Sequence, residues 1–106
     1  MYKPLPESLT IKTSKVNGLG LFALENITLG TNMGMSHLKI GDTIFRTPLG
    51  GFINHANEAN CVKAELRMTA EDIKGHAYNY KKWNLITIKD IKEGEELTVR
   101  YTFYNV

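Results

Sequence analysis

The sequence predicts a mainly β fold with very little helix, and three observations indicate it. Several segments alternate apolar and polar residues with a period of two and are rich in β-branched residues. Glycine-containing turn signals recur between these segments. The chain has 106 residues, of which 42% are hydrophobic and 23% charged, which is the composition of one globular domain. We expect that domain to run from residue 5 to residue 106.

Half-buried strands are predicted from the start of the chain onward. Leu9 and Ile11 flank Thr10, so apolar and polar side chains there would point to opposite faces of a strand. The same pattern predicts strands at residues 9–13, 61–66, 84–90 and 96–101. Turn signals lie at Asn17-Gly18, Leu29-Gly30, Ile40-Gly41-Asp42, Leu49-Gly50-Gly51 and Lys92-Glu93-Gly94.

A helix is predicted only at residues 69–74. Thr69 suits the N-cap position, and Glu71 and Asp72 suit the positive end of a helix dipole. Gly75 suits a left-handed stop after the last turn. The segment has room for one or two turns.

The charge distribution argues against some classes of partner. Thirteen Lys and Arg against eleven Asp and Glu give a net charge of +2, and Lys81-Lys82 is the only adjacent basic pair. Because phosphate binding normally needs clustered basic residues, no direct nucleic-acid partner is expected. The longest apolar stretch, at residues 19–24, is far shorter than the ~20 residues of a membrane span. With no export signal visible either, we expect an intracellular protein without a membrane partner.

The first candidate motif is the glycine pair Gly18 and Gly20, which leads into Leu21-Phe22-Ala23 at the mouth of a predicted strand. Glycines allow backbone amides and carbonyls to approach a ligand closely. An isolated pair of this kind is more often a plain turn, and no third glycine completes a dinucleotide-binding fingerprint.

The second candidate motif is Phe52-Ile53-Asn54-His55, with Asn60 downstream. An apolar pair there runs directly into two side chains that form directional hydrogen bonds. A lone histidine beside an apolar run is more often a structural residue than a ligand. No second ligand lies at metal-binding spacing from His55, and Cys61 is the single cysteine, so neither a metal site nor an internal disulfide is expected.

The third candidate motif covers residues 91–101. Its acidic turn contains Glu95 and Glu96, which we interpret as turn and strand-anchoring residues, and the following strand ends at Tyr101. Taken alone, the turn would be a solvated loop, and Tyr101 would pack with Phe103 and Tyr104.

Together and in this order, the three motifs resemble the SET domain family of S-adenosylmethionine-dependent protein lysine methyltransferases. The resemblance covers about residues 10–104. It implies a β-clip-like fold of small β-sheets with a C-terminal pseudoknot, in which the last segment threads beneath a loop. It also implies S-adenosylmethionine as the cofactor and transfer of its methyl group to a lysine side chain of a protein or peptide.

The resemblance implies two groups of site residues. The cofactor would be held by the backbone of Gly18, Leu19 and Gly20 and by the side chains of Asn54, His55 and Phe103. Tyr101 would be the catalytic residue that orients the lysine amine, and Val99, Phe103 and Tyr104 would line the substrate channel.

The chain departs from the family pattern where substrates would be recognised. Ala56-Asn57 and Ala59 stand where relatives usually have Ser-Cys and Pro, and the stretch between the first two motifs is short. A homodimer is expected, because a second copy would complete the trimmed groove. Two other hypotheses are a catalytically silent module that binds S-adenosylmethionine or a peptide, and a nucleic-acid binder that uses Lys81, Lys82 and Trp83.

Overall fold

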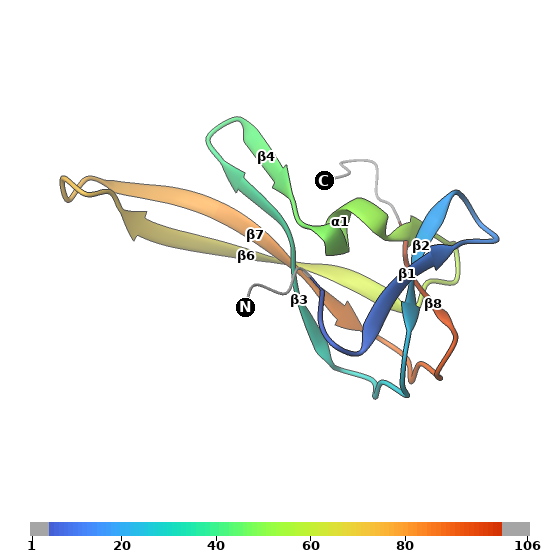
Figure 1. Cartoon of the computed structure of the whole chain (residues 1–106). Helices are drawn as coiled ribbons and strands as arrows, with labels where there is room; N and C mark the ends of the chain where they lie inside the picture. Colours follow the sequence, from blue (N-terminus) through green and yellow to red (C-terminus); the bar gives the residue numbers. More distant parts are fainter. Residues whose placement is uncertain (1–4, 101–106) are drawn as a thin grey trace.

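The fold is built from eight strands and one short helix within residues 5–100, which are the residues that this computed structural model describes (Figure 1). These elements are β1 (Leu9–Thr13), β2 (Leu19–Ala23), β3 (Asn32–Ile40), β4 (Thr43–Arg46), α1 (Pro48–Phe52), β5 (Asn54–His55), β6 (Cys61–Glu71), β7 (Ala77–Thr87) and β8 (Glu96–Val99). The prediction of a mainly β fold with very little helix is therefore confirmed.

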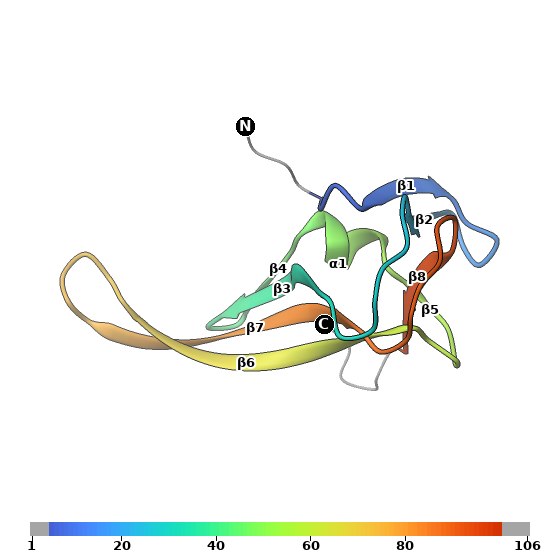
Figure 2. The same cartoon turned by 90° about the horizontal axis from the view of Figure 1, so that it is seen from below.

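The strands form one curled sheet in the order β1-β2-β8-β6-β7-β3-β4, and β5 pairs with β8 outside this path. Neighbours are antiparallel except that β8 runs parallel to both β5 and β6. The β6–β7 hairpin projects away from the rest of the molecule, with the β3–β4 hairpin beside it (Figures 1 and 2). We call these four strands the arm, and β1, β2, β5, β8 and α1 the body.

The hydrophobic core joins the body to the inner end of the arm. Leu21 of β2, Leu85 of β7 and Leu97 of β8 are completely buried in it. The whole core cluster consists of Leu9, Leu21, Ala23, Ile27, Met33, Leu49, Ile53, Cys61, Leu85, Ile91, Leu97 and Val99. The body strands β1, β2 and β8 contribute to this cluster, and so do the inner parts of the arm strands β3, β6 and β7. The cluster therefore fixes how the motif segments meet.

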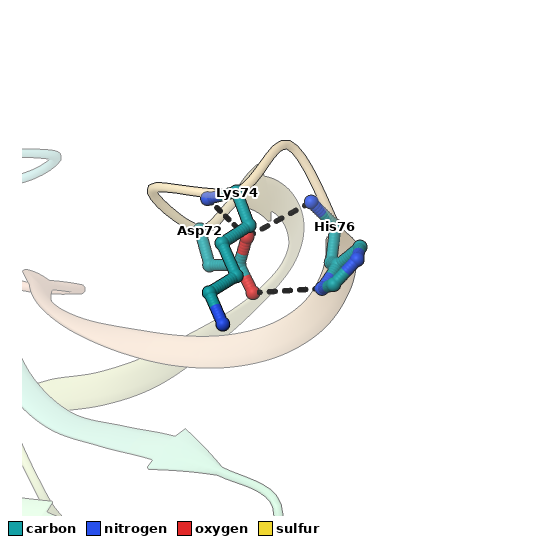
Figure 3. A network of polar contacts seen from close by, with 3 residues as sticks. All are labelled: Asp72, Lys74 and His76. Carbon is teal, nitrogen blue, oxygen red and sulfur yellow. Dashed lines mark hydrogen bonds and ion pairs between the residues drawn. The ribbon is translucent and has the colours of Figure 1, made fainter.

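The helix predicted at residues 69–74 is wrong. Strand β6 continues to Glu71, and Thr69 pairs with Asn79 of β7. Asp72 closes the hairpin, because its Oδ1 accepts hydrogen bonds from the backbone N–H groups of Lys74 and His76, each at 2.9 Å (Figure 3). Short polar side chains that cap helices also form such turns, and the eleven-residue ladder with β7 decides between the two conformations.

Two further elements differ from the prediction. The Leu49-Gly50-Gly51 turn signal is part of helix α1, which Thr47 caps and which begins with Pro48. Gly50 is required there because a Cβ atom would collide with the backbone of Ser36 and the ring of His37. Strands β3 and β4 were not predicted, since β-bulges interrupt the alternation along β3.

The predicted strand at residues 9–13 is confirmed, and the last predicted strand is confirmed as far as Val99. Strands β6 and β7 extend well beyond the predicted 61–66 and 84–90 toward the hairpin tip, whereas β7 ends at Thr87 and the chain bends after it rather than continuing to residue 90. The pseudoknot expected after Arg100 falls outside the described residues. Between residues 5 and 100, no helix is long and apolar enough to cross a membrane.

Candidate functional site

Asn54 lies where the turn between β1 and β2 meets strands β5 and β8. Its Nδ2 donates hydrogen bonds to the carbonyl oxygens of Asn17 and Leu19, each at 3.1 Å, and to Oε2 of Glu96 at 2.8 Å. One side chain thus joins all three motifs, although they are far apart in the sequence.

The carboxylate of Glu96 also holds the β1–β2 turn through Ser14. Oγ of Ser14 donates to Oε1 of Glu96 at 2.7 Å and accepts a hydrogen bond from the backbone N–H of Val16 at 2.9 Å. Hydrogen bonds to a charged acceptor are about twice as strong as neutral ones. Glu96 is therefore the anchor of this turn, consistent with its interpretation as a strand-anchoring residue.

The two glycines of the first motif are needed for different reasons. Gly20 is buried against Glu96 and Asn54, and a Cβ atom there would collide with the carboxylate and approach the amide closely. Gly18 has a φ of +47° and open space around it, so its conformation rather than its surroundings favours glycine. Gly18 and Leu19 form an exposed strip of backbone, with half of Leu19 accessible.

The side chain of Asn54 keeps one acceptor for a ligand. Its Oδ1 accepts no hydrogen bond from residues 5–100. No buried side-chain nitrogen or oxygen in this range lacks a partner, so this oxygen must reach the surface. Next to the exposed backbone of Gly18 and Leu19, such an acceptor suits the ammonium group of an amino acid. This acceptor therefore fits the ammonium group at the amino-acid end of S-adenosylmethionine.

His55 and Val99 lie opposite each other in the parallel pair formed by β5 and β8. Nε2 of His55 lies 3.2 Å from Oδ1 of Asn57, and the backbone N–H of Ala56 donates to the carbonyl of Val99 at 3.0 Å. Val99 itself is 1% exposed and belongs to the hydrophobic core.

Of the predicted site residues, the structure brings Gly18, Leu19, Gly20, Asn54, His55 and Val99 into this region. The remaining three, Tyr101, Phe103 and Tyr104, lie outside the described residues.

Asn60 is a structural residue of this region for which the sequence suggested no role. Its Nδ2 donates to the carbonyl of Glu96 at 2.9 Å, and its Oδ1 accepts from the backbone N–H of Thr98 at 2.8 Å. The side-chain amide thus pairs with β8 as a neighbouring strand would. The only hint in the sequence was the spacing between Asn54 and Asn60 in the second motif.

A comparison with protein-family models finds a match to the SET domain over residues 35–102, which is more than half of the chain. The chain belongs to the SET domain family. The members of this family are typically S-adenosylmethionine-dependent lysine methyltransferases. The first motif of this SET domain precedes the matched range, so its place in the fold rests on the hydrogen bonds of Asn54 and Glu96.

Solved structures show the same fold. A Plasmodium falciparum protein provisionally described as a histone methyltransferase matches with a TM-score of 0.64 and 15% identity, over 93% of this chain and 96% of that one. An apo Polycomb Repressive Complex 2 with a doubly mutated Ezh2 matches with a TM-score of 0.60 and 22% identity, over 92% of this chain. The Chaetomium thermophilum complex in a humanised, inhibitor-bound form matches with a TM-score of 0.59 and 21% identity, over 88% of this chain.

The present chain covers only 15% and 14% of the length of the two Polycomb chains that it matches. A search of curated protein sequences finds no match. Within residues 5–100, no cluster of three His, Cys, Asp or Glu residues could hold a metal ion.

Proposed function

We propose that this SET domain is a protein-lysine N-methyltransferase that uses S-adenosylmethionine. The observation that carries the proposal is the Asn54 junction, which joins the exposed backbone of Gly18 and Leu19 to the strand that leads to Tyr101. Membership of the SET domain family supports the same reaction class.

The residues of this chain would bind and orient the two reactants. Oδ1 of Asn54 would accept from the ammonium of the cofactor, the Gly18–Leu19 backbone would contact its amino-acid portion, and His55 would lie near its adenine. S-adenosylmethionine supplies an electrophilic methyl group. Glu96 accepts a hydrogen bond from Nδ2 of Asn54 and so fixes the orientation of that amide. Oδ1 of Asn54 is therefore held in one direction.

The remaining requirement is a neutral lysine amine aligned with the methyl group. Lysine has an ordinary pKa of about 10.4, so an apolar channel would have to favour the uncharged form. Alignment of the reactants can lower the activation barrier by roughly 7 to 11 kcal/mol, and no covalent enzyme intermediate is needed. We assign Tyr101 to orient the amine, with Phe103 against the cofactor and Val99, Phe103 and Tyr104 around the lysine.

A module that binds the cofactor without turnover is the second candidate. It is favoured by the departures from the family pattern at Ala56-Asn57 and Ala59, which follow His55 directly. A protein or peptide lysine would then be bound but not methylated.

Calorimetry with S-adenosylmethionine and a radiolabelled methyl-transfer assay on mixed cellular proteins test both candidates. The methyltransferase predicts binding and transfer, with transfer reduced at least tenfold by Tyr101→Phe. The matched control is Tyr78→Phe, an exposed tyrosine on the arm, which should leave transfer unchanged. Binding without transfer would favour the silent module, and the absence of cofactor binding would exclude the methyltransferase.

A further inference from the structure

Strand β4 is an exposed edge of the arm. It ends the strand order, and among the strands of residues 5–100 it pairs only with β3. All of its residues are exposed, including Ile44 at 45% and Phe45 at 51%. Proteins usually protect such edges with lysine, proline or a covering segment. The other edge strand, β1, is partly buried and contains Lys12, whereas β4 contains neither lysine nor proline. Strand β4 is therefore suited to pairing with a further strand.

The backbone groups available for such pairing belong to Ile44 and Arg46. In an antiparallel pair, residues that exchange hydrogen bonds alternate with residues whose N–H and C=O groups point away from the partner strand. The N–H of Thr47 donates to the carbonyl of Ser36 at 3.0 Å, directly after the last β3–β4 pair. Alternation from that bond directs every second residue of β4 toward β3 and leaves Ile44 and Arg46 with outward-facing groups.

The charges around β4 are arranged symmetrically about Ile44. Asp42, in the turn that joins β3 to β4, is two residues before Ile44, and Arg46 is two residues after it. Both are exposed, and within residues 5–100 no ion pair joins either to another residue. If two copies of β4 pair antiparallel about a two-fold axis at Ile44, Arg46 of each copy lies opposite Asp42 of the other. A shift of two residues would place Arg46 opposite Ile44 and lose both contacts.

We propose that this chain forms a homodimer in which β4 pairs with β4 of a second copy and joins the two arms into one continuous sheet. The two-fold axis makes the contact between Asp42 and Arg46 twice, as an isologous interface requires. A peptide of another protein can also add to a sheet edge. The second copy is favoured because its own β4 supplies an acidic and a basic residue at the two matching positions.

This surface lies in the stretch of chain between the first two motifs, which comprises residues 24–51 and contains β3 and β4. The homodimer expected from the sequence would therefore form through that same stretch. Its formation needs neither the cofactor nor methyl transfer, so the outcome of the test below is independent of the proposed function.

Sedimentation velocity of the full chain over a concentration series, without cofactor, measures the dimer dissociation constant. Arg46→Asp places two carboxylates opposite each other twice and should raise this constant about tenfold. Combining it with Asp42→Arg restores opposite charges and should return the constant to near the wild-type value. The matched control is Arg67→Asp, which makes the same charge change at an exposed residue of β6 and should leave the constant unchanged.

Cysteine cross-linking tests the register. Ile44→Cys places two cysteines opposite each other with Cα atoms about 5.5 Å apart, which is within the range of a disulfide. In a glutathione redox buffer this variant should form a covalent dimer. Cys61 is 1% exposed and does not compete. The control is Ile73→Cys, which is fully exposed near the tip of the β6–β7 hairpin and should cross-link much more slowly.

Three results would overturn the proposal. They are a chain that is monomeric at every concentration, an equal weakening by Arg46→Asp and Arg67→Asp, and faster cross-linking of Phe45→Cys than of Ile44→Cys. Circular dichroism of each variant shows whether it is folded. Because the charge variants and the cysteine variants report on the same register by different measurements, one series decides the question if a variant of the other fails to fold.

Discussion

The amide of Asn54 donates to the carboxylate of Glu96 at 2.8 Å, and this bond connects the second motif to the third. The same carboxylate accepts from Ser14 in the turn that carries the first motif. Glu96 therefore determines the position of both proposed cofactor contacts without itself facing the ligand. It is a positioning residue rather than a catalytic one.

Replacing this carboxylate should weaken both the fold and cofactor binding. Glu96→Gln removes the charge from the acceptor of Asn54 and Ser14, which should cost about 2 kcal/mol of the free energy of unfolding. We expect the affinity for S-adenosylmethionine to fall roughly tenfold, which corresponds to about 1.4 kcal/mol. Urea denaturation and calorimetry measure the two effects. Glu95→Gln is the control, because the Glu95 carboxylate accepts a hydrogen bond from the backbone N–H of Lys92 in an exposed turn, and an equal effect there would contradict the prediction.

Alanine at the two glycines of the first motif should separate packing from conformation. Gly20→Ala forces a methyl group against Glu96 and Asn54, which should destabilise the fold by about 2 to 3 kcal/mol. The methyl group of Gly18→Ala meets no neighbour, so the free energy of unfolding falls only by the cost of the positive φ, about 1 kcal/mol. Thermal unfolding of both variants measures the difference. A larger loss for Gly18→Ala would show that the close approach at Gly20 is relieved by a shift of Glu96.

Removing the amide of Asn60 should loosen β8. Asn60→Ala leaves the N–H of Thr98 and the carbonyl of Glu96 without a partner, at a cost of about 2 kcal/mol. The comparison variant is Asn26→Ala, which removes one hydrogen bond to the backbone of Glu93 in an exposed turn and should cost less than about 1 kcal/mol. Amide hydrogen exchange should show β8 opening more often in Asn60→Ala, and unchanged protection at Thr98 would contradict this role.

Acid should destabilise the protein through His37. Burial, and then Lys63 and Arg46, lower the pKa of His37 to about 4, against an ordinary value of 6.5. Between these values the unfolded chain binds more protons than the folded one, so the free energy of unfolding falls as the pH drops. The full loss is about 3 kcal/mol, and it is absent above pH 6.5. Denaturation of the wild type and of His37→Gln at pH 7 and pH 4.5 measures it, and parallel losses in the two proteins would exclude His37 as the cause.

The parts of the fold that could be predicted are those with a simple period. Leu9, Thr10 and Ile11 form a half-buried strand because alternation directly reports one buried face. At Asp72 the same residues satisfy the rules for a helix start and for a hairpin turn, and only the ladder between β6 and β7 distinguishes them. Local sequence cannot contain that information, since it depends on a second strand.

The candidate site was predictable to a different extent. The resemblance to a known family named Asn54 and the glycines, because their types and spacing form motifs. The partners of Glu96 and Asn60 were not predictable, because their hydrogen bonds join residues 42 and 36 positions apart, which no spacing rule supplies.

The position of β8 late in the chain has a consequence for the order of folding. Each of the hairpins β1–β2, β3–β4 and β6–β7 closes over a short stretch of chain and can form early. Strand β8 pairs with β2 across about 75 positions, from Leu21 to Leu97, and such distant closure is slow. During synthesis β8 is also made after every other described strand. The junction around Asn54 should therefore be completed last, because its hydrogen bond to Glu96 forms only after β8 has been made.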